Sequence, residues 1–216
     1  MFTGLIERMG RIKEFHQAGT FYRLAIEAEN FSGELVTGQS VAVSGACLTV
    51  TRNDSKIFEV EMMQETFKRT WFGKNLRPGT KINLERAMRL SDRLDGHLVL
   101  GHVDGVAKLI ELKGTDTKEA VFVPEDRELL RGIVSKGSVA IDGVSLTVIN
   151  VSDKNFSVGL IPATLSATTL GSLKPGSFIN LETDILGKYI ARLTEFAQGT
   201  RPQREGGNYL ASLLEM

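Results

Sequence analysis

Five side chains in this sequence are of types that could carry chemistry, and four of them form two matched pairs. Cys47 and Thr49 stand two residues apart, and Ser145 and Thr147 repeat that arrangement about a hundred residues later. A thiol or hydroxyl can attack a ring or position a water molecule, and hydroxyls can hydrogen-bond a polar ligand. His102 carries an imidazole that can transfer protons near neutral pH. A lone cysteine is also commonly a small core residue, which leaves two interpretations of Cys47 open.

The elements that must position these side chains occur twice. Residues 36–50 reappear as residues 134–148, and residues 76–85 reappear as residues 173–182 after one deleted residue. A period of about a hundred residues is too long for a solenoid unit and suits a small globular domain. The sequence therefore predicts two tandem domains.

Short apolar and β-branched runs separated by turn residues dominate both copies. Ser40 to Val50, Ile57 to Met62 and Lys81 to Leu84 read as strands, which is typical of an all-β barrel or sandwich. Short helices are predicted at Thr66 to Thr70 and at Pro124 to Ile133.

The tail of the chain differs from the repeat. Apolar residues between Asp184 and Phe196 recur at helical spacing and predict an amphipathic helix outside the repeat. We expect it to associate subunits, with packing on its own barrel as the alternative. Residues 202–207 read as a loose segment, and residues 209–216 read as a terminal helical turn or as disordered.

Composition narrows the class of protein. Lys plus Arg and Asp plus Glu both total 26, so no overall charge favours nucleic acid or an anionic membrane as a partner. No run suggests a membrane span, a signal segment, a metal site or a nucleotide-binding glycine loop. We expect a cytoplasmic protein that binds a small molecule.

Four segments in order resemble the riboflavin synthase family: Met1-Phe-Thr-Gly-Leu-Ile-Glu7, Gly45-Ala-Cys-Leu-Thr49, Gly96-His-Leu-Val-Leu-Gly-His102 and Asp142-Gly-Val-Ser-Leu-Thr147. The resemblance covers nearly the whole chain. It implies an all-β fold of two tandem six-stranded Greek-key barrels with a C-terminal α-helix. It also implies the dismutation of two 6,7-dimethyl-8-ribityllumazine molecules into riboflavin and 5-amino-6-ribitylaminouracil, without a cofactor or metal.

The resemblance further implies how the chain is divided and assembled. Residues 1–97 would form the N-terminal lumazine-binding barrel, residues 98–185 the C-terminal one, and residues 186–216 a trimerisation helix and tail. The reacting pair would lie between the N-terminal barrel of one subunit and the C-terminal barrel of a neighbour in a homotrimer. Lumazine synthase is a further candidate partner.

Residue roles follow from the same resemblance. The catalytic candidates are Cys47, His102, Ser145 and Thr147. Binding residues are expected at Gly4, Leu5, Ile6, Cys47, Leu48, Thr49, Glu61, Met62, Met63, Gln64, Glu65 and Thr66 for the first copy, and at Gly101, His102, Val103, Lys136, Ser145, Leu146, Thr147, Ile161, Pro162, Ala163, Thr164, Leu165 and Ser166 for the second.

In the reaction that the resemblance implies, one lumazine molecule donates a four-carbon unit and the other accepts it. Differences between the two copies should determine which molecule is the donor and which is the acceptor. We expect Cys47 against Ser145, Glu65 against Ala163, and Lys136 against Gly38 to carry that division. Gly4 is matched to Gly105, and His102 to Met1. His97 is placed in a linker, and Trp71 in a core. The alternative function is a non-catalytic lumazine or flavin carrier of the same fold.

Overall fold

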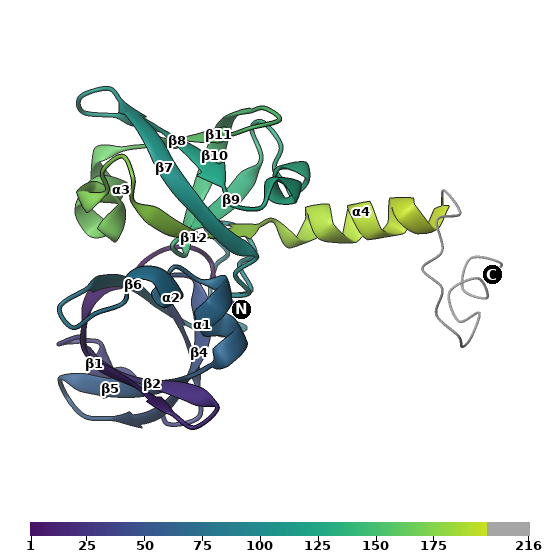
Figure 1. Ribbon diagram of the computed structural model, residues 1–216. Helices are drawn as coiled ribbons and strands as arrows, with labels where there is room; N and C mark the ends of the chain where they lie inside the picture. Colours follow the sequence, from purple (N-terminus) through teal and green to yellow (C-terminus); the bar gives the residue numbers. More distant parts are fainter. Residues whose placement is uncertain (198–216) are drawn as a thin grey trace.

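The computed structural model describes residues 1–197 and contains two closed antiparallel barrels, drawn in purple to blue and in teal to green in Figure 1. Around each barrel the strands follow equivalent orders, β1-β2-β5-β4-β3-β6 and β7-β8-β11-β10-β9-β12. The strands are β1 Arg8–Ala18, β2 Phe21–Glu27, β3 Ser40–Val43, β4 Ala46–Asn53, β5 Ile57–Met63, β6 Lys81–Arg86, β7 Gly105–Lys113, β8 Lys118–Pro124, β9 Ser138–Ile141, β10 Val144–Val151, β11 Phe156–Leu160 and β12 Phe178–Thr183. The two-barrel, all-β prediction is confirmed.

Alternation within the strands builds each barrel core. In β5, Phe58, Val60 and Met62 are buried, and Phe156 and Val158 take the equivalent places in β11. Burial of every second side chain is what a strand with one face toward a core requires.

Short helices join the strands. They are α1 Gln64–Arg69, α2 Phe72–Asn75 and α3 Pro162–Ala167, with 3-10 turns at Ser32–Glu34, Arg127–Gly132 and Thr169–Ser172. The helix predicted at Pro124 to Ile133 is only partly correct. Pro124 is buried at the end of β8, and the helical turn begins at Arg127.

The run from Ser40 to Val50 is two strands and not one. A hairpin turn at Ser44 and Gly45 separates β3 from β4, and both residues have positive φ, at 41° and 81°. Asp142 and Gly143 form the equivalent turn in the second barrel, at 47° and 79°. Two consecutive positive-φ residues are typical of the turn that joins tightly twisted strands.

These two hairpins hold the barrels together. A Cβ atom at Gly45 would lie 2.7 Å from the backbone nitrogen of Gly143, so the absence of a side chain at these glycines lets the two hairpins approach each other closely. Beside them, Asn83 donates to the carbonyl of Asp142 at 2.9 Å, and Asn180 donates to the carbonyl of Ser44 at 2.8 Å. The barrels are therefore related by a near-twofold arrangement of equivalent contacts.

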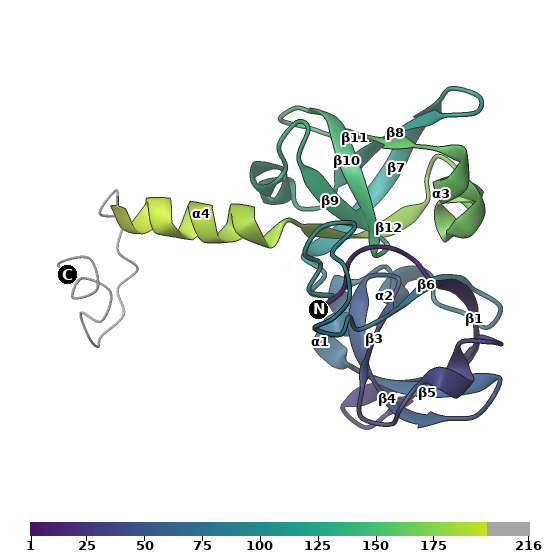
Figure 2. The ribbon, with the colours of Figure 1, turned by 180° about the vertical axis from the view of Figure 1, so that it is seen from behind.

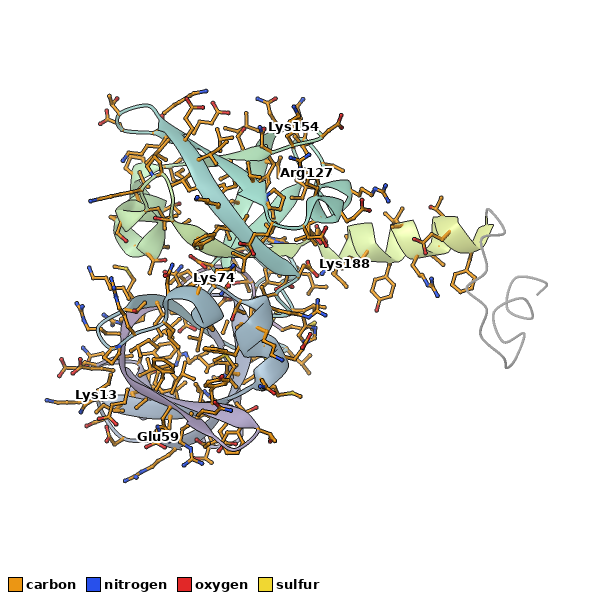
Figure 3. The ribbon with its side chains drawn as sticks, in the orientation of Figure 1. Lys13, Glu59, Lys74, Arg127, Lys154 and Lys188 are labelled. Carbon is orange, nitrogen blue, oxygen red and sulfur yellow. The ribbon has the colours of Figure 1, made fainter. Side chains whose placement is uncertain are left out.

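The predicted tail helix is present as α4, Ile185–Ala197, which projects away from both barrels in Figures 1 and 2. Lys188, labelled at its base in Figure 3, pairs with Asp104 at 2.6 Å and ties its first turn to the second barrel. One face of α4 is apolar and 43–65% exposed, and it consists of Leu186, Tyr189, Ile190, Leu193 and Phe196. The predictions for residues 202–207 and 209–216 lie outside the described residues.

Candidate functional site

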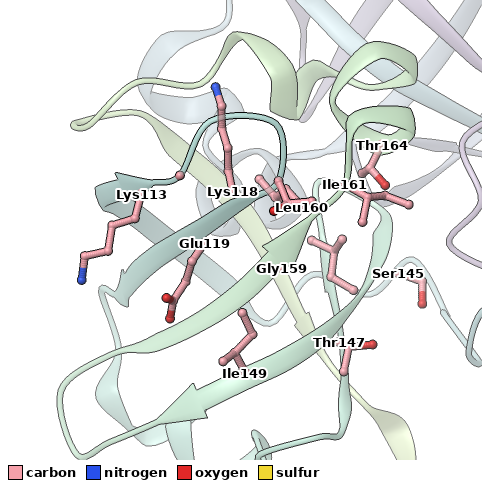
Figure 4. Close-up of a pocket in the computed structure, with 13 residues that line it drawn as sticks. Lys113, Lys118, Glu119, Ser145, Thr147, Ile149, Gly159, Leu160, Ile161 and Thr164 are labelled. Atoms are coloured by element: carbon pink, nitrogen blue, oxygen red, sulfur yellow. The ribbon is translucent and has the colours of Figure 1, made fainter.

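The second barrel contains a pocket of about 640 Å³ between β10, β11, α3 and the β7–β8 hairpin (Figure 4). This volume is in the range of sites that hold a small organic ligand. Five predicted residues line it: Ser145, Leu146, Thr147, Ile161 and Thr164. These five predicted residues therefore surround one cavity.

Other lining residues were missed by the sequence analysis. They are Lys113, Gly114, Thr117, Lys118, Glu119, Ile149, Gly159 and Leu160. Lys118 and Glu119 reach the pocket because β8 pairs with β11, which places them opposite Leu160 and Gly159. A prediction of this strand pairing would have indicated both residues.

The remaining predicted residues of this region lie outside the pocket lining. Pro162, Ala163 and Ser166 are on exposed positions of α3, and Leu165 packs against the barrel core. Lys136 is an exposed turn residue with φ 65°, and its backbone nitrogen donates to the carbonyl of Val148 at 2.9 Å. Gly38 donates to Val50 in the same way, so the expected match of Lys136 with Gly38 is confirmed.

Ser145 has a partner that the sequence analysis assigned to the linker. Nδ1 of His97 lies 2.7 Å from Oγ of Ser145. Burial lowers the pKa of His97, and the nearby charge of Asp184 opposes that change. A neutral imidazole can accept a proton from a hydroxyl, so His97 and Ser145 form a candidate proton-transfer pair at the pocket wall.

The N-terminal segment of the chain covers this Ser145 from the other barrel. The carbonyl of Gly4 accepts from the backbone nitrogen of Ser145 at 2.8 Å, and a Cβ at Gly4 would lie 2.6 Å from Cβ of Ser145. Glu85 holds the segment by accepting from the backbone nitrogens of Thr3 and Gly4 at 2.6 and 3.1 Å. Ile6 packs against the core of the second barrel. Residues 4–6 therefore belong beside the second pocket, although they precede the first barrel in sequence.

The segment before the second barrel covers Cys47 in the same way. The carbonyl of Gly101 accepts from the backbone nitrogen of Cys47 at 2.8 Å, and a Cβ at Gly101 would lie 2.5 Å from Cβ of Cys47. Glu182 accepts from the backbone nitrogens of Leu100 and Gly101 at 2.7 and 3.0 Å. The segment that precedes each barrel therefore packs against the other barrel. Burial raises the pKa of both carboxylates, Glu85 and Glu182.

This packing corrects two matches made from the sequence. The structural counterpart of Gly4 is Gly101 and not Gly105, because Phe2 pairs with Val99 and the two glycines make equivalent contacts. His102 consequently matches Leu5 and not Met1. His102 is exposed, follows the residue that covers Cys47, and makes no hydrogen bond or ion pair within the described part of the chain. Val103, next to it, packs against the first barrel's core.

The first barrel differs from the second at the pocket wall. Arg23 and Glu61 form a cross-strand ion pair of 2.8 Å where the second barrel has Glu119 and Gly159. The ring of Tyr22 stacks on Phe67 with centroids 3.9 Å apart. These contacts engage groups that the equivalent wall of the second barrel leaves open, which makes the two barrel walls chemically unlike.

Other predicted residues of the first barrel follow the pattern of its copy. Leu48 and Met62 are buried, whereas Leu5, Thr49, Met63 and Gln64 are exposed. Thr66 is partly buried. The carboxylate of Glu65 pairs with Arg69 at 2.6 Å on the surface of α1. Trp71 is buried in the first barrel's core, as predicted.

No three His, Cys, Asp or Glu side chains in residues 1–197 lie close enough to bind one metal ion together. No helix in the same range has the length and apolar character to cross a membrane.

Comparison with known proteins agrees with this geometry. The lumazine binding domain family matches residues 3–87 and again residues 100–184. The chain is 43% identical to riboflavin synthase of Actinobacillus pleuropneumoniae over 88% of each protein, and 40% identical to that of Schizosaccharomyces pombe over 90% of this chain and 94% of the relative. LumP complexed with 6,7-dimethyl-8-(1'-D-ribityl) lumazine has a TM-score of 0.75 and 25% identity, over 85% of this chain and 99% of LumP.

The duplication, the unlike walls of the two barrels and the similarity across nearly the full length point the same way. This chain belongs to the riboflavin synthase family.

Proposed function

We propose that this chain converts two molecules of 6,7-dimethyl-8-ribityllumazine into one riboflavin and one 5-amino-6-ribitylaminouracil. One lumazine, the donor, loses a four-carbon unit and becomes 5-amino-6-ribitylaminouracil, and the other, the acceptor, gains those four carbons and becomes riboflavin. The reaction is the final step of riboflavin biosynthesis. One observation carries the proposal: the chain repeats one barrel, and the strand pair that walls the pocket of the second barrel carries different side chains in the first, so that two identical molecules would meet unlike surroundings.

Each site supplies its own chemistry. In the second barrel, Ser145 is hydrogen-bonded to the neutral His97, and Thr147 offers a hydroxyl to the ribityl chain or the ring edge. These groups suit removal of a proton from the acidic C7 methyl group and stabilisation of the resulting anion. In the first barrel, Cys47 suits addition to the acceptor ring or positioning of a water molecule, and the neighbouring His102 suits proton transfer. The remaining predicted residues would bind the rest of each lumazine.

Assembly completes the site in this proposal. The exposed apolar face of α4 supports association of three subunits, with the first barrel of one subunit facing the second barrel of a neighbour. We take residues 1–97 and 98–185 as the two ligand-binding units, with residues 186–216 as the association element. A cytoplasmic location and an association with lumazine synthase complete the proposal.

The alternative is a carrier that binds lumazine or flavin without turnover. LumP has been solved with riboflavin at a TM-score of 0.75 and 28% identity, and with flavin mononucleotide at 0.73 and 26%. Similarity to riboflavin synthases is higher, at 38–43%. This difference favours the enzyme.

Turnover separates the two functions. The purified chain is incubated with 6,7-dimethyl-8-ribityllumazine and no other reagent, and both products are followed by chromatography. The enzyme predicts that riboflavin and 5-amino-6-ribitylaminouracil form in equal amounts. Tight binding with no product over a long incubation would instead identify a carrier.

A further inference from the structure

A second cavity lies between the two barrels, away from the pocket of β10 and β11. Its volume is about 610 Å³, and it is bordered by residues from α2, the turn before β6, the 3-10 turn at Thr169–Ser172 and the start of β12. No residue is shared between the linings of the two cavities. The mechanism proposed above leaves this cleft unused.

The cleft arises from a difference between the repeats. Trp71 and Thr169 are equivalent, because the backbone nitrogen of Trp71 donates to Asn180 at 2.9 Å and that of Thr169 donates to Asn83 at 2.8 Å. The indole of Trp71 fills its side of the junction and donates to Oδ1 of Asp142 at 2.8 Å. Thr169 occupies much less volume at the matching place, which leaves space open along the junction.

The hydroxyl group of Thr169 also lacks a hydrogen-bond partner. Thr169 is 8% exposed, and its Oγ1 atom is buried without a hydrogen-bond partner. A buried hydroxyl without a hydrogen-bond partner destabilises the folded state. Thr169 lines the cleft, although its Oγ1 atom is itself buried, so its side chain must rotate before a bound molecule can accept its hydrogen bond.

Four other polar side chains at the cleft can donate hydrogen bonds to a ligand. Arg77 and Lys81 line it, and neither forms an ion pair within residues 1–197. The Thr80 and Ser177 hydroxyl oxygens already accept from the backbone nitrogens of Arg77 and Lys174, which leaves their O–H groups able to donate. The acidic group in the lining is Asp142, whose Oδ1 accepts from both Trp71 and Asn180.

We propose that this inter-barrel cleft binds a small phosphorylated ligand, with the phosphate at Arg77 and Lys81 and the body of the ligand reaching the Thr169 hydroxyl. A fully ionised phosphate group accepts hydrogen bonds and donates none. It therefore matches a lining of guanidinium, ammonium and hydroxyl donors. Trp71 and Phe178 supply apolar walls for the organic part of a phosphomonoester. The site shares no lining residue with the pocket of β10 and β11.

Trp71 is the single tryptophan of the chain, and it reports directly on the cleft. Its fluorescence is titrated at constant ionic strength with inorganic phosphate and, separately, with glycerol 3-phosphate. The proposal predicts a saturable change in emission. Binding of the ester at least about tenfold tighter than phosphate identifies an organic ligand, and equal affinities identify the free ion as the ligand.

Three variants test whether the change in Trp71 fluorescence arises from binding at the cleft. Arg77→Gln and Thr169→Val should each weaken binding about tenfold or more, whereas Lys154→Gln, at an exposed turn of the second barrel, should not. Thr169→Val also removes an unpaired buried hydroxyl, so the unliganded variant should unfold at the same or a higher temperature. No saturable change with either probe, or equal affinities in all three variants, would overturn the proposal.

Discussion

Asp142 should make the stability of this chain decline toward alkaline pH. The side chain is buried at the junction of the barrels, and burial raises its pKa from 3.8 to about 7, although hydrogen bonds from Asn180 and Trp71 oppose the change. A pKa raised in the folded state means that the protonated form is favoured there. The contribution of Asp142 to stability is therefore full below pH 3.8 and is lost as the pH rises through 7.

The size of the effect follows from the two pKa values. Their separation corresponds to about 4 kcal/mol, at 1.36 kcal/mol for each pH unit. Between pH 5 and pH 8 the loss is about 3 kcal/mol, because part of it has already occurred at pH 5. In Asp142→Asn the carbonyl oxygen can still accept from Trp71 and Asn180, and the group no longer ionises.

Urea unfolding at pH 5 and pH 8 tests this reasoning. Trp71 fluorescence follows the transition, at one fixed protein concentration. The free energy of unfolding of Asp142→Asn minus that of the parent should rise by about 3 kcal/mol from pH 5 to pH 8. Taking this difference cancels the titration of Glu85, Glu182 and His97, and the exposed substitution Asp116→Asn should produce no such change. A difference that is constant with pH would refute the assignment.

Three further substitutions address the site and the assembly. His97→Gln should lower kcat about 100-fold while lumazine affinity, measured by fluorescence, stays within about threefold, because it removes the proton acceptor next to the pocket. Gly101→Ala should lower the free energy of unfolding by about 2 kcal/mol more than Gly79→Ala in urea melts, since both residues have positive φ and a clash arises only at Gly101. Equal losses would contradict the close approach. Tyr189→Asp should shift the chain to a smaller species in analytical ultracentrifugation, and Ala191→Asp, on the opposite side of α4, should not.

Most of the fold could be predicted from the internal sequence repeat. Two copies of about a hundred residues predicted two equivalent domains, and the pattern of short apolar runs predicted strands. The hairpin at Ser44 and Gly45 was missed because apolar residues continue on both sides of it. Its signal was the Ser-Gly pair, which Asp142 and Gly143 repeat as Asp-Gly, a pair typical of a two-residue turn.

The contacts between the barrels could not be predicted from residue patterns within single strands. His97 was placed in a linker because that stretch is polar, yet its ring reaches Ser145 through the folded arrangement of both barrels. The packing of Gly4 and Gly101 likewise depends on carboxylates at the far ends of the repeats, Glu85 and Glu182. The Gly-Leu-Ile segment at residues 4–6 and the Gly-His-Val segment at residues 101–103 were the sequence signal for the correct match.

In the proposed function, two copies of one molecule react while each is bound in a different pocket, and the two pockets come from different subunits. Two variants, each carrying one blocked pocket, Thr49→Trp and Thr147→Trp, are purified, shown to be inactive, mixed, unfolded and refolded together. If the site joins the first barrel of one subunit to the second barrel of its neighbour, roughly a quarter of the sites in a random mixture are intact, and activity returns to about that level. No recovery, with mixed oligomers demonstrated by mass spectrometry, would contradict the claim.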